Sequence, residues 1–188
     1  MAMAAPKSQQ GALVTKAIDQ LNISVKKNEN AKNMNNLAVA QTLNGEYVDA
    51  KVTATKALSL AKKDKVTKKI KSNLAPQHIR DGEYEEAIVM LGASTLSSTS
   101  TFNMGLAHLL KKDFDAAKTN LDNATKDNGS ANAYYAAAIT ASRSGDESTM
   151  AARLKKSIEM NADLRARAID DLEFKKYWEA ESFKGAIK

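Results

Sequence analysis

The chain has 188 residues and a net charge of +6, which permits an acidic partner but does not demand one. Cysteine is absent, so disulfides, thiol catalysis and cysteine-ligated metals are excluded. Apolar residues make up 43% of the chain, but alanine dominates them and aromatic residues account for only 5%, which suits thin contacts between helices better than one large core. No window approaches the roughly 18 consecutive apolar residues of a transmembrane helix.

Residues 1–10 are predicted to be a disordered N-terminus or residues foreign to the natural protein, and they lack the charged and apolar regions of a secretory signal. A helix is expected from about Gly11 to Lys27, followed by a turn at residues 28–30. Its Ala17 and Leu21 are spaced like a later pair, Ala117 and Leu121. We therefore assign residues 11–30 to a half repeat and expect a fragment of a longer exported protein, with a cytosolic protein as the alternative.

From Asn36 onward, one pattern of two helices joined by a tight turn occurs four times. Its turn positions, which lie 37, 30 and 33 residues apart, are Gly45, Gly82, Lys112 and Gly145. A small residue follows five positions later in three of the four repeats and lets the two helices approach closely; these residues are Ala50, Ala87 and Ala117. The predicted repeats cover residues 31–61, 65–95, 100–128 and 130–161.

The second repeat departs from the pattern at Pro76, which lies in the middle of its first helix. Proline removes a backbone hydrogen bond and crowds the preceding turn, so a kink or an early break is expected there. The Ser/Thr-rich stretch LGASTLSSTSTF that ends at Phe102 is predicted to be a loop, with Thr99 or Ser100 capping the next helix. The segment DNGS at residues 127–130 predicts another stop and restart.

Six lysines gather between Lys62 and Lys71, at the start of the second repeat. They could meet nucleic acid, an acidic lipid surface or an acidic peptide, but the favoured interpretation is a solvated helix start and loop. No aromatic residues are interleaved to stack on bases, so nucleic acid is not favoured as a partner.

The tail, residues 162–188, has lost the repeat pattern and is predicted to form capping helices. Asp163 is expected to cap a helix that runs to about Ile169. Four apolar side chains are then expected to fold back onto the last repeat: Leu172, Phe174, Tyr177 and Trp178.

No constellation of residues predicts catalysis, a metal site or a cofactor. The only histidines, His78 and His108, each stand four residues before a turn position, where a large packed side chain is expected. Glu83, Glu85 and Glu86 lie at the start of a helix, where acidic residues favour the helix dipole. Phosphate-loop, zinc-protease and dinucleotide motifs are absent, so we do not expect an enzyme or a small-molecule substrate.

The period near 34 residues and the helix–turn–helix pattern resemble the tetratricopeptide repeat, or TPR. The resemblance implies an all-α, right-handed α-solenoid of about four TPR hairpins with an extra N-terminal helix and a C-terminal capping segment. It also implies a non-catalytic scaffold that binds a protein or peptide in a concave groove. A structural spacer with no ligand of its own is the alternative, and the oligomeric state is not predicted.

A closer resemblance covers about Asn33 to Lys184 and rests on NNLAVAQTLNGEY, NMGLAHLLKKDFDAAKTNL and LKKSIEMNADLRARAIDDLEFKKY. These segments are similar to TPR-containing cell-envelope proteins of Bacteroidetes-type Gram-negative bacteria. That likeness implies a periplasmic or envelope location within a larger envelope protein, with a cytoplasmic location as the alternative.

The candidate groove residues begin with three asparagines that each stand nine residues before a turn position. In TPR proteins that bind peptides, an asparagine at this place faces the groove and can both donate to and accept from a bound backbone. The alternative is that these asparagines bond to neighbouring helices and set the packing. The complete predicted set is Asn36, Asn73, Asn103, Phe102, Leu106, Asn132, Tyr135 and Ile139.

Overall fold

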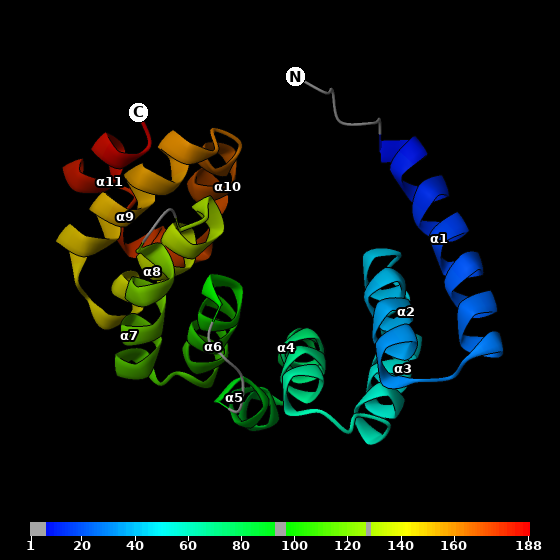
Figure 1. Ribbon diagram of the computed structural model, residues 1–188. Helices are drawn as coiled ribbons and strands as arrows, with labels where there is room; N and C mark the ends of the chain where they lie inside the picture. Colours follow the sequence, from blue (N-terminus) through cyan, green and yellow to red (C-terminus); the bar gives the residue numbers. More distant parts are fainter. Residues whose placement is uncertain (1–6, 93–96, 127–128) are drawn as a thin grey trace. The chain divides into compact units, whose positions relative to one another are not determined.

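A computed structural model describes residues 7–92, 97–126 and 129–188, and these residues form helices and turns without any strand (Figure 1). They divide into an N-terminal unit, residues 7–83, and a C-terminal unit, residues 84–92 and 97–188. Each unit is an array of helices in which neighbours along the chain pack together. Within the described residues, no helix is both long enough and apolar enough to cross a bilayer.

The N-terminal unit contains four helices, α1 (Lys7–Lys27), α2 (Ala31–Leu43), α3 (Tyr47–Ser59) and α4 (Asp64–Arg80). Helices α2 and α3 form the closest pair, while α1 packs on α2 and α4 packs on α3. The side chain of Asn30 accepts hydrogen bonds from the backbone of Lys32 and Asn33, both at 3.0 Å, and so starts α2 where the predicted turn ends. Helix α1 begins at Lys7 and not at Gly11, which corrects the predicted start of the half repeat.

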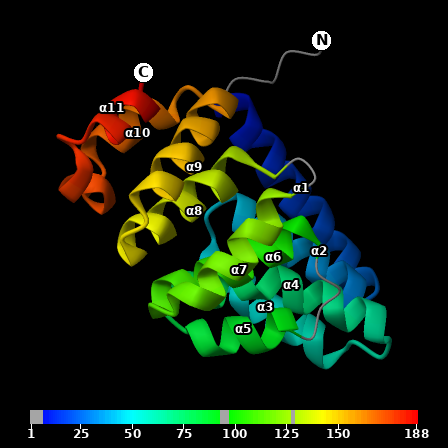
Figure 2. The same ribbon diagram turned by 90° about the vertical axis from the view of Figure 1, so that its left-hand side faces the viewer.

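The C-terminal unit begins with α5 (Tyr84–Gly92), α6 (Ser98–Lys111), α7 (Phe114–Thr125), α8 (Ala131–Ser144) and α9 (Glu147–Met160). Its tail forms α10 (Leu164–Asp170), the 3₁₀ helix η1 (Leu172–Tyr177) and α11 (Glu181–Ala186). Helices α6 with α7 and α8 with α9 are the two closest pairs, and the tail segments pack against α8 and α9 (Figure 2).

The predicted turn positions share one backbone conformation. The φ angles of Gly45, Gly82 and Gly145 are +80°, +80° and +83°, and Lys112 adopts a similar +68° although it carries a side chain. This left-handed conformation ends the preceding helix, and only glycine adopts it without steric cost. The turn of the third repeat therefore keeps the left-handed conformation at Lys112, even though glycine, the residue that favours it, is missing there.

In the second repeat, the predicted early break and the predicted cap of the next helix are wrong, while the alternative of a kink at Pro76 stays a prediction. Helix α4 does not break at Pro76 but runs on to Arg80, because Leu74, Ala75 and Ile79 are buried on either side and their packing outweighs the loss of one backbone hydrogen bond. Helix α6 is capped by Ser97, whose hydroxyl accepts a hydrogen bond from the Ser100 backbone at 3.1 Å.

Ser100 itself is buried in the first turn of α6, which is why it does not act as the cap. The predicted Ser/Thr-rich loop is therefore shorter than expected at its end, while its part at 93–96 lies outside the described residues. Residues 127–128 of the next predicted stop also lie outside them. At the restart, Ser130 caps α8 by accepting from the Ala133 backbone at 3.2 Å.

Helices α6 and α7 of the C-terminal unit approach each other closely where Gly105 meets Leu121. A Cβ atom built on Gly105 would lie 2.6 Å from Leu121 Cγ and 3.1 Å from its backbone nitrogen. Ala117 and Leu121 are both fully buried at this contact. The small residues of the repeat thus let a leucine fill the space that a larger side chain on α6 would take.

The tail completes the core of the last helix pair. Phe174 is fully buried and stands edge-on to Tyr135, with ring centroids 5.6 Å apart and planes at 82°. Tyr177 and Phe183 are buried in the same cluster, and Trp178 packs against it. Leu172, however, is 72% exposed, so its predicted burial is wrong. A 3₁₀ helix has three residues per turn, which puts Phe174 and Tyr177 on one face and Leu172 on another.

Asp163 precedes α10 as predicted, but its side chain makes no capping hydrogen bond. Instead, the Asp163 backbone N–H donates to the side chain of Asn161 at 3.1 Å. The residue that organises this turn is therefore Asn161.

We expect Gly105→Ala to destabilise the protein by roughly 1–3 kcal/mol, because the added methyl group must displace Leu121 or push the helices apart. Urea denaturation followed by circular dichroism measures this. Gly185→Ala is the matched control, since a Cβ atom there meets nothing within 4 Å. An unchanged urea midpoint for Gly105→Ala would contradict the close approach of α6 and α7.

Phe174→Ala is expected to cost about 3–5 kcal/mol, because it empties a fully enclosed aromatic site between the tail and α8. Leu172→Ala, two residues away on the exposed face, should stay within about 0.5 kcal/mol of the wild type. Thermal and urea melting of both variants check the pair. Equal effects of the two substitutions would show that the tail does not contribute to the core.

Candidate functional site

A pocket of about 260 Å³ opens between α6 and α8 and is bordered by α10. Three lining residues follow one another at helical spacing on α6, and four do so on α8. The eighth comes from α10. The lining consists of Phe102, Leu106, Leu109, Asn132, Tyr135, Ala136, Ile139 and Arg167.

The lining residues differ in how much surface they offer to a ligand. Leu109 and Tyr135 are each only 2% exposed, so they form the wall of the pocket and belong mainly to the core. Phe102, Leu106 and Ile139 are half-buried and present apolar surface to the opening. Such a site can enclose an apolar side chain of a ligand, which gains roughly 1.5–3 kcal/mol if it becomes fully buried.

Polar groups border this apolar surface on two sides. The guanidinium of Arg167 lies over the ring of Tyr135, 4.7 Å from its centroid, and its Nε is 3.9 Å from Asp171 Oδ2. The Arg167 side chain remains 61% exposed, so it has donors left for a ligand. On the other side, the exposed amide of Asn132 can both donate and accept.

The Tyr135 hydroxyl is fixed beneath Arg167. It donates a hydrogen bond to Asp171 Oδ2 at 2.8 Å. Burial and this hydrogen bond to the Asp171 carboxylate raise the pKa of Tyr135 above its usual range. The hydroxyl therefore stays protonated and acts as a fixed donor that connects α8 to the tail.

Five of the eight predicted groove residues line this one pocket: Phe102, Leu106, Asn132, Tyr135 and Ile139. The prediction missed Leu109, Ala136 and Arg167. The first two continue the apolar stripes at helical spacing, so the pattern could have indicated them. Arg167 comes from the tail, where no repeat register exists to place it.

The three predicted asparagines are not part of this pocket. Asn73 donates from Nδ2 to the side-chain oxygen of the buried Asn35 at 3.0 Å, which is a contact between α4 and α2. Asn103 is buried in α6, and Asn36 is exposed on α2. For Asn73, the bond to Asn35 fits the alternative that the asparagines set helix packing, while the roles of Asn36 and Asn103 stay predictions.

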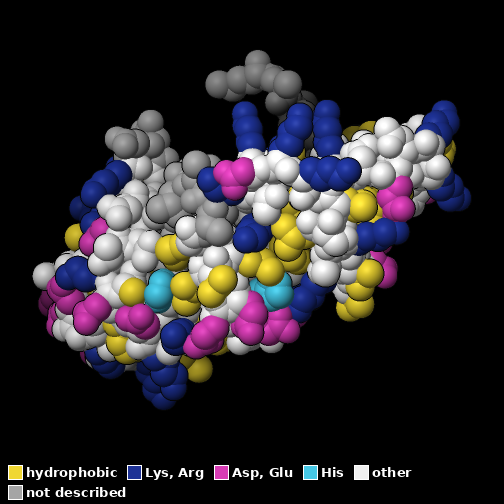
Figure 3. Space-filling model, turned by 60° about the horizontal axis from the view of Figure 1, so that its bottom comes forward, with side chains coloured by type: hydrophobic (Ala, Val, Ile, Leu, Met, Phe, Trp, Pro, Cys, Tyr) yellow, Lys and Arg dark blue, Asp and Glu magenta, His cyan; other side chains and the backbone are white. Residues whose placement is uncertain are grey.

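Both histidines pair with an acidic residue just beyond the turn that follows them. His78 Nδ1 lies 2.5 Å from Glu83 Oε2, and His108 Nδ1 lies 3.1 Å from Asp113 Oδ2. Figure 3 shows acidic side chains (magenta) next to both imidazoles (cyan). The two imidazoles are only 11% and 15% exposed, so each is packed at the end of a first helix.

Glu83 belongs to a larger charged cluster in the N-terminal unit. Lys51 Nζ lies 2.8 Å from Asp81 Oδ2 and 2.6 Å from Glu83 Oε2, and so joins α3 to the end of α4. These hydrogen bonds from Lys51 lower the pKa values of both carboxyl groups, with Arg80 adding to the effect on Asp81 and His78 to that on Glu83. They raise the pKa of Lys51 in return.

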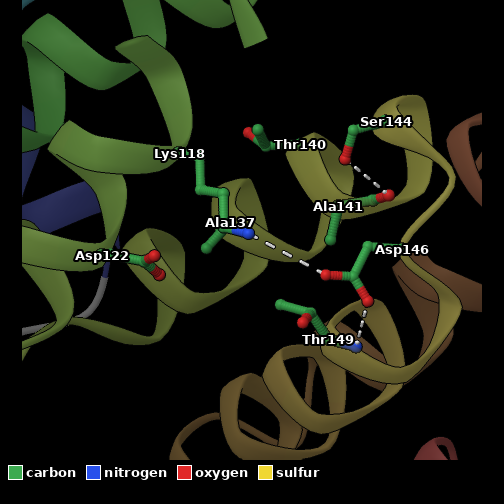
Figure 4. Close-up of a pocket in the computed structure, with 8 residues that line it drawn as sticks. All are labelled: Lys118, Asp122, Ala137, Thr140, Ala141, Ser144, Asp146 and Thr149. Atoms are coloured by element: carbon green, nitrogen blue, oxygen red, sulfur yellow. Dashed lines mark hydrogen bonds and ion pairs between the residues drawn. The ribbon is translucent and has the colours of Figure 1, made fainter. Parts of the chain in front are cut away.

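A second hollow of the C-terminal unit, between α7, α8 and α9, is lined mostly by polar residues but is very small (Figure 4). Its volume of about 10 Å³ is the space of a single water molecule. Lys118 Nζ lies 4.0 Å from Asp146 Oδ2, and Asp146 caps α9 by accepting from the Thr149 backbone at 3.0 Å. Hydrogen bonds from Thr149 lower the pKa of Asp146. This hollow is therefore a structural feature of the helix junction rather than a ligand site.

In the described parts of the chain, no three His, Asp or Glu side chains are grouped to hold a metal ion. The pocket between α6 and α8 therefore offers apolar contact, one guanidinium and one amide. This combination is suited to binding a peptide side chain beside carbonyl or carboxylate groups.

The helix pairs, their left-handed turns and their small packing residues define the fold of tetratricopeptide repeat proteins. Comparison with solved structures gives the same class. A scan against protein-family models finds no match, and no curated protein is significantly similar in sequence.

Three solved structures are similar to the chain over most of its length. A MamA RS-1 ArsTM double mutant has a TM-score of 0.66 and 16% sequence identity, and the match covers 80% of this chain and 86% of that chain. YrrB, described as a TPR protein with an unusual peptide-binding site, has a TM-score of 0.65 and 14% identity, and the match covers 88% of each chain. TTC0263, a thermophilic TPR protein of Thermus thermophilus, has a TM-score of 0.60 and 20% identity, with 85% of this chain and 92% of that chain covered. At these identities the likeness shows the fold alone.

We expect Lys51→Met to lower the melting temperature at neutral pH, because it removes the partner of Asp81 and Glu83. The pKa values of both carboxyl groups are lowered from 3.8 and 4.5, so their contribution is complete above pH 4.5 and is lost as the pH falls through the folded-state values. The raised pKa of Lys51 makes its contribution complete below pH 10.5. Melting curves across this range should show a difference from wild type that disappears in acid; a pH-independent difference would contradict the assignment.

Proposed function

We propose that this chain is a non-catalytic protein-interaction scaffold whose pocket between α6 and α8 binds a peptide segment of a partner protein. The observation that carries the proposal is the lining of this pocket. Half-buried Phe102, Leu106 and Ile139 surround a volume of about 260 Å³ and lie next to free donors. A helix array with no ligand would gain more stability by closing this apolar surface than by leaving it open.

The geometry favours a peptide with one large apolar side chain. That side chain would fill the pocket, while the Asn132 amide would bond to the peptide backbone. Arg167 would pair with a carbonyl or carboxylate of the same segment, since its donors remain exposed. The pocket walls are fixed by the core through Tyr135 and Leu109, so little conformational freedom is lost on binding. The peptide-binding site of the structurally similar YrrB supports this proposal.

We also propose that the protein acts in the cell envelope as part of a larger envelope protein. This rests on the sequence resemblance over about Asn33 to Lys184, and the +6 net charge is compatible with it.

The test is capture of partners from envelope and cytosolic fractions of the source organism on the immobilised chain, followed by mapping of the bound peptide and calorimetry. Asn132→Arg should weaken binding at least about tenfold, because it fills the mouth of the pocket from an exposed position without touching the core. Ile169→Ser, an exposed apolar position of the same unit outside the pocket, should bind like the wild type.

Equal binding by wild type and Asn132→Arg would exclude this pocket. Failure of the chain to retain any peptide would instead favour the spacer function. Retention of the mapped partner from the cytosolic fraction only would overturn the envelope location.

A further inference from the structure

One edge of the N-terminal unit collects the ends of its four helices. Neighbouring helices pack on each other and run antiparallel, because short connections join them, residues 28–30 between α1 and α2 and residues 60–63 between α3 and α4 (Figure 1). The C-terminal ends of α1 and α3 therefore lie at the same edge as the N-terminal ends of α2 and α4. An ion pair joins the two connections directly, since Lys56 in the last turn of α3 pairs with Glu29.

A single buried cluster fixes these helix ends to one another. It contains Ala31 from α2, Ala57 from α3 and Ile70 from α4, and Val25 of α1 packs against it. Exposed side chains that are distant in sequence therefore keep fixed places on one surface.

The charges on this surface are mostly positive. Its two carboxylates are each paired with a lysine, Glu29 with Lys56 and Asp64 with Lys68, the latter at 2.7 Å. Six further lysines are exposed and have no ion-pair partner among the residues that the structure describes. We call them the basic edge, which consists of Lys26, Lys27, Lys32, Lys62, Lys63 and Lys65.

The fold thus joins lysines of α1 and α2 to the lysine-rich stretch that begins at Lys62, whose role the sequence leaves open. Like charges gathered on one surface repel one another, and an anionic partner relieves this repulsion. Residues 24–33 and 56–69, which form the edge, contain neither arginine nor an aromatic residue. The planar fork of arginine and the face of an aromatic ring are the usual means of recognising nucleic acid, and the edge has neither.

We propose that the basic edge binds the surface of a lipid bilayer that carries anionic headgroups. Its lysines come from the ends of helices and from a short connection, so they spread over an edge instead of enclosing a groove, and a planar surface can meet them together. Clusters of about four to eight basic residues are typical of proteins that adsorb to acidic lipid. The contacts join exposed ammonium groups to headgroup phosphates, so the binding weakens as salt is added.

The inference goes beyond the proposed peptide binding and does not rest on it. The basic edge and the pocket between α6 and α8 lie in different units and share no residue. Either can fail in its own experiment while the other holds.

The test uses the full chain and vesicles of phosphatidylcholine with about one third phosphatidylglycerol, and measures co-sedimentation at physiological salt. We expect the variant Lys26→Gln, Lys27→Gln, Lys62→Gln, Lys63→Gln to weaken binding at least about thirtyfold, because each lysine near an acidic bilayer contributes roughly fivefold. Lys32 and Lys65 stay unchanged, since they also line a pocket between α2 and α4.

The matched control removes the same charge from exposed positions of the C-terminal unit and should bind like the wild type. It carries the substitutions Lys155→Gln, Lys156→Gln, Lys175→Gln and Lys188→Gln. Vesicles of phosphatidylcholine alone should not bind the wild type, and salt at about 0.5 M should release it from the acidic vesicles.

Two half variants test whether the fold unites the lysines into one surface. Lys26→Gln, Lys27→Gln and Lys62→Gln, Lys63→Gln should each weaken binding at least about fivefold, because both pairs face the same bilayer.

Four results would overturn the proposal. The first is no co-sedimentation with the acidic vesicles. The second is an equal loss in both quadruple variants, which would mean a general attraction to a basic protein. The third is a loss confined to the Lys62→Gln, Lys63→Gln pair, which would mean that the stretch acts without the rest of the edge. The fourth is tighter binding of a DNA duplex or of polyglutamate with the same loss in the first quadruple variant, which would assign the edge to nucleic acid or to an acidic protein.

Discussion

The close approach of the helix pairs depends on small residues at the points where two helices cross, and it is clearest in the pair α6 and α7. Gly105 faces Leu121 so closely that a single methyl group would not fit, and the repeated alanines at Ala50, Ala87 and Ala117 are fully buried. The core between α6 and α7 is thin, because this contact buries one leucine, Leu121, against a small residue, Gly105, rather than a broad apolar layer. One pair cannot stand alone on such contacts, so the pairs must stack on each other. Larger apolar side chains of the first helices, Phe102 and Leu106 on α6 and Ile139 on α8, line the pocket between these helices.

The repeat register could be predicted from the sequence because it depends on local offsets. A left-handed turn, followed by a small residue in three of the four repeats, is enough to place the hairpins, and this held even at Lys112, where glycine is missing. Details that depend on tertiary packing were not predictable in this way. Pro76 stays inside α4 because buried neighbours hold the helix together, and Ser97 caps α6 because Ser100 is needed inside the first turn.

The candidate site likewise contains residues that local spacing in the sequence predicts and residues that only the tertiary structure places. The stripes that contain Phe102 and Ile139 follow from helical periodicity, so five of the eight predicted residues share one pocket. The asparagines follow the same period, but Asn73 bonds to Asn35 on a neighbouring helix, and a partner of this kind cannot be read from spacing within one helix. Arg167 reaches the pocket from a segment without any repeat, so only the folded tail places it.

The order of contacts along the chain also bears on how the protein folds. Helices that pack most closely, α2 with α3, α6 with α7 and α8 with α9, are direct neighbours in sequence, so forming them closes only short loops at a small cost in chain entropy. The tail is different. Ser142 and Arg143 form hydrogen bonds to Glu173, about thirty residues later in the sequence. Tyr135 forms one to Asp171 across a similar separation along the chain. Each hairpin can therefore begin to form locally, although it becomes stable only when stacked on its neighbours. Docking of the tail requires α8 and α9 to be in place, so we expect it to be a late step of folding.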